Sequence, residues 1–487
     1  MHRLSALDAA FLYLETPDTP MHIGSLTVFR ASENADGLFE RFVAHTRARL
    51  SLLPSYTRRL KPTPLDLDHP VWTPAEPELD WHLRHCALPS PGTMEQLRAE
   101  VARQHAIPLE RSRPLWQYCL IEGLQDGGFA VYAKVHHAAM DGVAGLGTLG
   151  VVYDFVPDAP PPRPRPKMDD EQEPDALELT SSALADFVRQ IGRAISGTPS
   201  LVRTLAGLYP NLMRDARAVL SYARGAPQTR LNRPIRRERV FATSSLPLAD
   251  VKALAKETGS TINDIVLALS AGALRRYLES HDDLPEKPLV AAVPASLREK
   301  DDWRLNNQVV FTLAHLPTDI DDPRERLAAA KLSMQESKEI FGEVRGLITT
   351  DFSAPGAPIV TEALARLPGS RATQALPSWF NIVISNVPGP NRPMYFDRAA
   401  ATHYFPVSIP YHNNALNITV QSYCDTLDFG LVACRRAVPD AQAIADAIVE
   451  EFESLARPAR KNPPRRPRAA APKKSAARAK KRPAKSA

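Results

Sequence analysis

The chain has 487 residues, which is too long for one hydrophobic core, so two domains are expected. Its longest apolar stretches, such as 265–274, are too short to cross a bilayer, which requires about 20 residues. The four cysteines have no CxxC spacing, which argues against a disulfide framework and against a zinc site built on cysteines.

The net charge of +5 conceals a sharp division along the chain. Residues 457–487 carry 13 Lys and Arg and no acidic residue, which leaves 47 basic against 55 acidic residues, a net charge of −8, in the rest. This basic tail is rich in Ala and Pro and has no large apolar side chain, so it is predicted to be disordered.

Residues 1–156 are predicted to form an N-terminal α/β domain. Apolar residues at helical spacing predict helices over 38–50 and 94–106. Runs rich in β-branched and aromatic residues predict neighbouring strands over 116–122 and 129–136.

A connecting region, 157–229, follows this domain. Its first part, 157–174, is so rich in proline that an exposed linker is expected. Its second part, 177–224, has a basic amphipathic pattern that is typical of a helix. Such a helix could lie on an anionic membrane surface or simply pack between domains.

Residues 230–456 are predicted to form a second domain that again mixes strands with helices. Strands are expected at 239–243, 289–294, 308–313, 381–385, 416–422 and 427–432. Helices are expected at 248–257, 261–278 and 441–455, with Gly259 ending the first and Thr261 capping the second.

The most informative segment is HHAAMDG at 136–142, which follows directly on the strand predicted at 129–136. Side chains alternate between the two faces of a strand, so His136 and His137 should point in opposite directions and cannot easily bind one metal together. No other cluster has metal-ligand spacing, and no metal site is predicted. An imidazole fixed at a strand end is well suited to accept a proton near neutral pH.

The surrounding residues restrict the chemistry further. Asp141 lies four residues beyond His137 and could orient its ring or anchor the turn, and Gly142 suits a turn or close packing. The sequence has no Gly-x-Ser-x-Gly motif and no cysteine in a nucleophile context. We therefore expect direct attack of a bound hydroxyl group on an activated acyl group, without a covalent enzyme intermediate.

HHxxxDG after a strand resembles the signature of the acyl-CoA-dependent acyltransferase superfamily, which includes chloramphenicol acetyltransferase-like enzymes and peptide synthetase condensation domains. Other segments resemble the bacterial wax ester synthase/diacylglycerol acyltransferase family in order and approximate spacing. These segments are LSALDAAF (4–11), PMHIG (20–24), RPLW (113–116), TINDIV (261–266), VPASLR (293–298), SNVPGP (385–390) and LNITV (416–420).

The resemblance implies two chloramphenicol acetyltransferase-like domains, with mixed sheets flanked by helices and a tunnel between the domains. It implies that His137 is the general base and that Asp141 supports the motif, whereas pleat geometry makes a direct role less expected for His136. Asn263 and Asp264 match a family motif that lines or braces the site. Acyl-CoA would be a substrate, and no resident cofactor is expected.

Two departures from the family pattern lie near the implied tunnel. Asn306 and Ala415 stand where the family often has glycine. We expect these changes to affect the size of the acceptor and the efficiency more than the type of reaction.

The implied acceptors are diacylglycerol, giving triacylglycerol, and a long-chain fatty alcohol, giving a wax ester. The alternatives are a relative that acylates another alcohol or an amine, and a non-catalytic protein that binds lipid surfaces. Asp8 lies where a signal peptide would need an apolar centre, so a cytoplasmic protein is expected. No aromatic residue interrupts the basic tail, so any contact that it makes with nucleic acid or anionic lipid would be electrostatic. Given the resemblance to acyltransferases, we expect the tail to favour a membrane or lipid-droplet surface over nucleic acid, and a simple solvated tail is the alternative.

Overall fold

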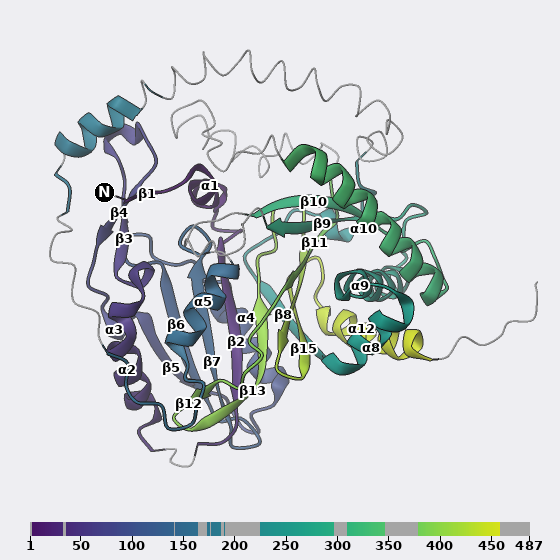
Figure 1. Ribbon diagram of the computed structural model, residues 1–487, viewed down its shortest axis with the longest axis horizontal. Coiled ribbons are helices and arrows are strands. Elements are labelled where there is room, and N and C mark those ends of the chain that lie inside the picture. The colour runs from purple at the N-terminus through teal and green to yellow at the C-terminus, as the bar shows by residue number, and fades with distance from the viewer. Residues whose placement is uncertain are drawn as a thin grey trace, which may run out of the picture.

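The computed structural model describes residues 2–32, 36–140, 142–163, 173–175, 177–186, 189, 225–296, 309–345 and 378–457. Two six-stranded mixed sheets and the helices packed against them make up most of these residues (Figure 1). Asp141, Asn306 and nearly all of the basic tail lie outside the described residues. So does most of the helix predicted over 177–224, of which 177–186 is described and helical.

The first sheet has the order β12-β13-β2-β7-β6-β5. Among its described strands, only β5 and β6 run parallel to each other. The strands are β2 (His22–Phe29), β5 (Leu83–Ala87), β6 (Trp116–Glu122), β7 (Phe129–His136), β12 (Tyr395–Phe396) and β13 (Ala399–Val407). A small separate sheet contains β1 (His2–Arg3), β3 (Arg58–Lys61) and β4 (Val71–Pro74).

Five helices accompany the first sheet in the described part of the N-terminal half. They are α1 (Ala6–Leu14), α2 (Leu38–Arg49), α3 (Leu79–His82), α4 (Met94–His105) and α5 (Gly142–Val152). Helices α2 and α5 bury residues such as Phe42 and Val152 with Phe29 and Phe129 of the sheet. The helices predicted over 38–50 and 94–106 are confirmed.

The second sheet has the order β10-β9-β11-β14-β15-β8, with β11 parallel to both of its neighbours. Its strands are β8 (Arg239–Pro247), β9 (Leu289–Ser296), β10 (Val309–Leu316), β11 (Ile382–Val387), β14 (Leu416–Tyr423) and β15 (Thr426–Cys434). The accompanying helices are α8 (Leu248–Thr258), α9 (Ile262–Glu279), α10 (Pro323–Arg345) and α12 (Ala441–Ala456). Helix α9, buried along most of its length, packs between the sheet and the other helices of this half.

The two halves are not separated by a single cut in the chain. The sequence assigns all of 230–456 to the second domain, but β12 and β13, from within that range, complete the first sheet beside β2. The strand pattern of a sequence does not reveal which sheet a strand joins, and so this exchange was not predicted.

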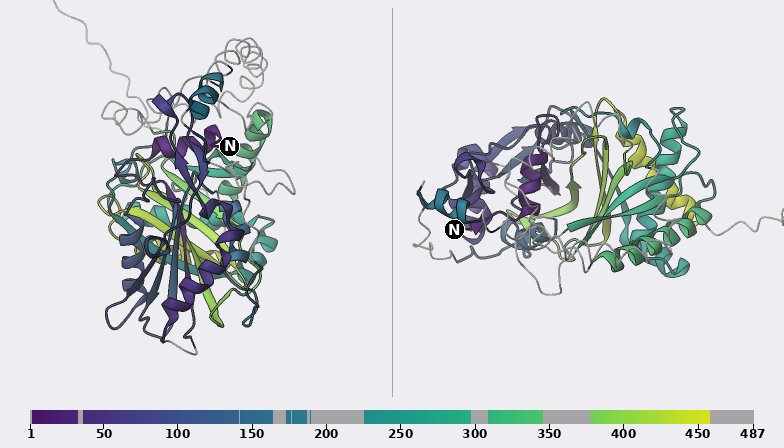
Figure 2. Two further views of the ribbon diagram at one scale, coloured as in Figure 1. Left: turned by 90° about the vertical axis from the view of Figure 1, so that its left-hand side faces the viewer. Right: turned by 90° about the horizontal axis from the view of Figure 1, so that it is seen from above.

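A third apolar cluster fills the space between the sheets. It joins Val101 of α4 and Tyr132 of β7 to Phe241 of β8 and Val432 of β15. Figure 2, seen from above, shows the purple-to-blue N-terminal half and the green-to-yellow C-terminal half side by side. The ends of β2 and β7 therefore lie near the junction of the two halves.

Candidate active site

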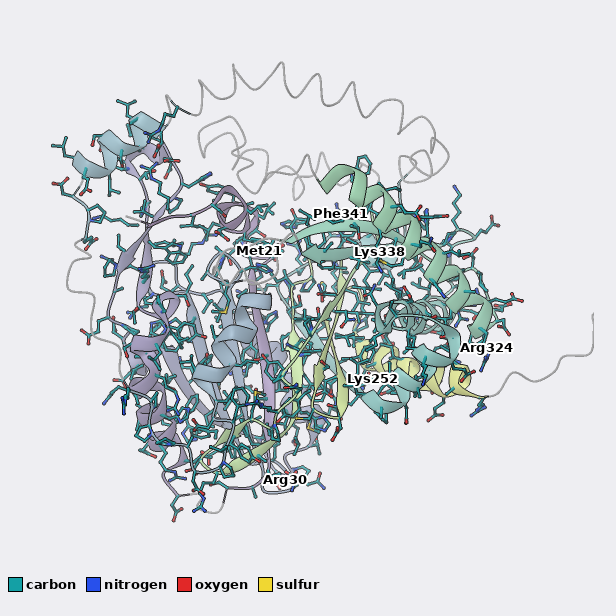
Figure 3. The ribbon with its side chains drawn as sticks, in the orientation of Figure 1. Met21, Arg30, Lys252, Arg324, Lys338 and Phe341 are labelled. Carbon is teal, nitrogen blue, oxygen red and sulfur yellow. The ribbon has the colours of Figure 1, made fainter. Side chains whose placement is uncertain are left out.

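The histidine motif is fixed where β7 ends. The His136 N–H donates to the Leu115 carbonyl at 2.9 Å, and the His137 N–H donates to the Met21 carbonyl at 2.8 Å. His136 also lies opposite His22 in the pairing of β7 with β2. The motif is therefore held from both sides by backbone, and Met21, labelled in Figure 3, lies at the upper end of β2 between the two halves.

The two histidines have different surroundings, as the alternation of side chains predicted. His136 is 0% exposed. His137 is only half-buried, and its ring stacks on Phe11 of α1 with centroids 3.9 Å apart and planes within 7°. The second imidazole of the motif is thus the one that combines a fixed ring with partial access to solvent.

His136 is used to hold the turn. Its Nδ1 accepts the Ala138 backbone N–H at 3.0 Å, so this nitrogen carries no proton and Nε2 carries the ring hydrogen. Nε2 lies 3.4 Å from Oε1 of Glu15. The buried imidazole therefore links the turn of the motif to a carboxylate on another segment.

Glu15 directly follows α1, and its carboxylate accepts three hydrogen bonds and lies close to His136. Oε1 accepts the Met21 N–H at 2.9 Å and faces His136, while Oε2 accepts two hydrogen bonds from Arg111 at 2.9 and 2.7 Å. Burial alone would raise the pKa of Glu15, but His136, Arg111 and the Met21 N–H together lower it to about 2. Glu15 is therefore a fixed negative charge beside the histidine pair.

A buried polar cluster lies beneath the motif on the side of α4. The Lys134 ammonium donates to the carbonyls of Gln104 and Ile107 at 3.1 and 2.8 Å. His22 Nε2 lies 2.7 Å from the His105 carbonyl, and burial lowers the pKa of both histidines. These residues attach the end of α4 to β2 and β7.

His105 extends this attachment to the second half of the chain. Its Nδ1 lies 2.7 Å from the Tyr132 hydroxyl, and its Nε2 lies 2.9 Å from the Ser408 carbonyl just after β13. Both ring nitrogens are therefore occupied, which suits a neutral structural imidazole.

Asp264 and Asn263 lie in the first turn of α9. Asp264 forms a capping box with Thr261: its Oδ2 accepts the Thr261 N–H at 2.8 Å, and its own N–H donates to Thr261 Oγ1 at 3.2 Å. Asn263 is half-buried. The contacts described for Asp264 thus give it a role at the start of its own helix, and lining of the site by either residue stays a prediction.

The remaining predicted residues are close to His137 in sequence. Gly142, the last residue of the motif, begins α5, and Asp141 lies outside the described residues. Across the described ranges, no group of three or more His, Cys, Asp or Glu side chains is arranged to hold a metal ion.

Sequence reasoning missed Glu15 and the roles of Phe11 and Arg111. One signal was available for Glu15. An acidic residue at the C-terminal end of a helix opposes the helix dipole, so its placement there indicates a compensating partner elsewhere. The identity of that partner depends on how β2 and β7 pair, which the local pattern does not specify.

Two family models match the chain. The wax ester synthase/diacylglycerol acyltransferase catalytic domain matches residues 4–266, and the C-terminal domain of the same family matches residues 305–456.

Named relatives agree with these models. A putative diacylglycerol O-acyltransferase of Mycobacterium tuberculosis H37Rv is 37% identical, and the match covers 93% of this chain and 99% of that protein. The O-acyltransferase WSD of Acinetobacter baylyi is 35% identical, with 93% and 96% covered.

Solved structures give the same result for the fold. The wax ester synthase/diacylglycerol acyltransferase of Marinobacter aquaeolei has a TM-score of 0.66 at 32% identity, covering 93% of this chain and 98% of that one. The first condensation domain of the calcium-dependent antibiotic synthetase has a TM-score of 0.58 at 16% identity, covering 93% and 95%, and this likeness concerns the fold alone. The predicted fold class, two acyltransferase-like units with mixed sheets and flanking helices, is confirmed.

Proposed function

Because the chain belongs to the wax ester synthase/diacylglycerol acyltransferase family, we propose that it transfers a long-chain acyl group from acyl-CoA to diacylglycerol, to a long-chain fatty alcohol, or to both. It is an O-acyltransferase, and the reaction forms one ester while releasing CoA. Both substrates are consumed in each cycle, and the proposed reaction requires no resident cofactor.

His137 is the proposed general base. Its neutral imidazole takes the proton of the acceptor hydroxyl as that oxygen attacks the thioester carbonyl carbon. The tetrahedral intermediate then collapses, the C–S bond breaks, and the CoA thiolate recovers the proton from the imidazolium. A positioned base of this kind contributes about 10²- to 10⁴-fold in rate.

One observation supports this assignment above the others. Of the two adjacent histidines at the end of β7, the first is 0% exposed and bonded into the turn, whereas the second is half-buried and fixed by stacking on Phe11. Only the second has both the rigidity and the access that a base needs. Asp141 and Gly142 are proposed to support the motif, and Asn263 and Asp264 to brace the site from α9.

The test replaces His137 with Ala and measures ester formation from labelled acyl-CoA, with diacylglycerol and hexadecanol offered together. We expect a loss of at least about 100-fold with an unchanged melting temperature. His281→Ala, at a half-buried histidine of the second half that pairs with Asp440, is the matched control. Wild-type turnover by His137→Ala would remove the base assignment, and incorporation into neither acceptor by the wild type would remove the neutral-lipid function.

Peripheral binding to a membrane or lipid-inclusion surface is proposed as well. No helix in the described ranges combines the length and apolarity needed to span a bilayer. Leu177 and Leu184 on the short helix at 177–186 are 78% and 53% exposed, and the tail supplies 13 basic residues. Each base close to an anionic surface contributes about 1 kcal/mol.

Deleting 457–487 tests the electrostatic part of this proposal. We expect unchanged activity on dispersed substrate, with less sedimentation on phosphatidylserine vesicles at low salt and a smaller difference at high salt. Equal sedimentation of both proteins at low salt would contradict a role for the tail.

A further inference from the structure

The segment from Glu15 to Met21, between α1 and β2, contacts both halves of the molecule. On the N-terminal side it holds the histidine pair. The Glu15 carboxylate faces His136 and accepts the Met21 N–H, while the carbonyl of Met21 accepts the His137 N–H. One carboxylate thus acts on His136 directly and on His137 through a single residue.

The same segment is held on its other side by residues from the second half of the chain. The carbonyl of Asp18 accepts a hydrogen bond from Arg239, at the start of β8, at 2.8 Å. The Asp18 carboxylate lies 3.3 Å from Arg236. The hydroxyl of Thr19 lies 3.1 Å from Nε2 of His412, in the turn between β13 and β14.

Two of the residues that make these contacts are buried, so the contacts would be costly to break. Thr19 is 0% exposed and Arg239 is 4% exposed, so neither can exchange its partner for water without moving. Between the two attachments lie only a few residues, including Pro17 and Pro20, whose φ angles are fixed. A displacement at His412 or Arg239 is therefore passed along a short and stiff segment to Met21 and Glu15.

We propose that residues 15–21 form a strap through which the second half of the chain positions His137. The positioning residues are Glu15, which begins the strap, and His412, which holds it at Thr19. Neither residue takes part in bond making or breaking. The strap sets the backbone position of His137, keeps His136 Nε2 within 3.4 Å of the Glu15 carboxylate, and so fixes the direction of the His137 imidazole. The functional consequence rests on the proposed function, in which His137 is the base.

Glu15→Gln is the sharpest substitution, because it keeps the shape and the acceptor for the Met21 N–H but removes the charge. Arg111, the cationic partner, has a side chain that is 45% exposed and can turn to water, so the variant is expected to fold. We expect kcat to fall about 10- to 100-fold with little change in KM, as for a misplaced catalytic group. Glu257→Gln, which removes a carboxylate paired with Arg324 on the surface, is the matched control.

A second readout does not depend on catalysis. Diethyl pyrocarbonate acylates neutral imidazole, and peptide mass spectrometry gives the rate of modification of His137 itself. Glu15→Gln and His412→Ala should each change this rate at least about threefold, while His281→Ala should leave it unchanged. Full activity of His137→Ala would overturn the role of His137 as the base in the proposed function. The modification rates of His137 would still test whether the strap positions its side chain.

The combination of both substitutions tests whether Glu15 and His412 act through one element. The change in log kcat of the double variant Glu15→Gln/His412→Ala should be clearly smaller than the sum of the changes in the two single variants. The reason is that the second substitution acts on a strap that the first has already displaced. Unchanged His137 modification in folded Glu15→Gln would overturn the proposal. Additive effects of the two substitutions would overturn the link between the halves.

Discussion

At the scale of single residues, Lys134 is a cationic side chain that is only 2% exposed. Burial lowers its pKa from 10.5 to about 7. At pH values between about 7 and 10.5, Lys134 is therefore protonated more in the unfolded chain than in the folded protein. The free energy of unfolding should therefore rise with pH in this window, by up to about 1.4 kcal/mol per pH unit from this group.

Lys134→Met tests this expectation in urea titrations from pH 7 to pH 10. The variant should lose the Lys134 contribution to the pH slope. It should also be less stable at pH 10, because the carbonyls of Gln104 and Ile107 lose their buried donor at about 1–3 kcal/mol each. An identical slope in both proteins would mean that Lys134 stays charged in the fold.

The sequence predicted the environment of a residue where that environment depends on its neighbours in the sequence. It did not predict contacts that depend on which strands pair in the sheet. The opposite environments of His136 and His137 follow from the alternation of a strand. Glu15 meets His136 only because β2 and β7 are adjacent, and no local pattern states that adjacency. For Asp264, the capping role follows from Thr261 three residues earlier and is local. Its predicted role in bracing the site depends on contacts with distant parts of the chain.

At the scale of elements, α9 depends on a glycine in its middle. A Cβ at Gly272 would lie 2.2 Å from the Glu451 carboxylate and 2.4 Å from the Arg326 guanidinium. These two side chains, from α12 and α10, form an ion pair in which both are almost completely buried. The missing side chain therefore leaves room for the charges that connect three helices.

Gly272→Ala should destabilise the protein by about 2–4 kcal/mol, although Ala favours a helix by about 1 kcal/mol over Gly. Displacing a buried ion pair costs more than helix propensity gains. Thermal and urea unfolding measure the change, with Gly342→Ala in α10, where a Cβ meets nothing within 4 Å, as the control. Equal stabilisation by both substitutions would contradict this packing argument.

Most elements of the second half were predicted with boundaries close to those observed, including the left-handed Gly259 that ends α8 and the Thr261 cap of α9. Both signals are local, because they use backbone dihedrals and side-chain oxygens within one turn. Strands β2 and β13 were not predicted. Their partners lie far away in the chain, and His22, Gly24, His403 and Pro406 interrupt their apolar runs.

At the scale of the whole molecule, we expect the exchange of β13 to make the two halves one folding unit. β13 pairs with β2 in the first sheet and contacts β14 and β15 of the second. Native-state hydrogen exchange in low urea should therefore show peptides of β2 and β7 opening together with those of β14 and β15. Earlier exchange of one whole sheet, with the other still protected, would show that the halves unfold independently.

The placement of β13 also has a consequence for synthesis on the ribosome. The first sheet keeps an open edge at β2 until residue 407 has left the exit tunnel, when more than four fifths of the polypeptide exists. During that interval an apolar strand offers unpaired amides to any neighbouring nascent chain. Expression yield should thus depend on chaperone supply and on translation speed before codon 399, rather than on the stability of the finished enzyme.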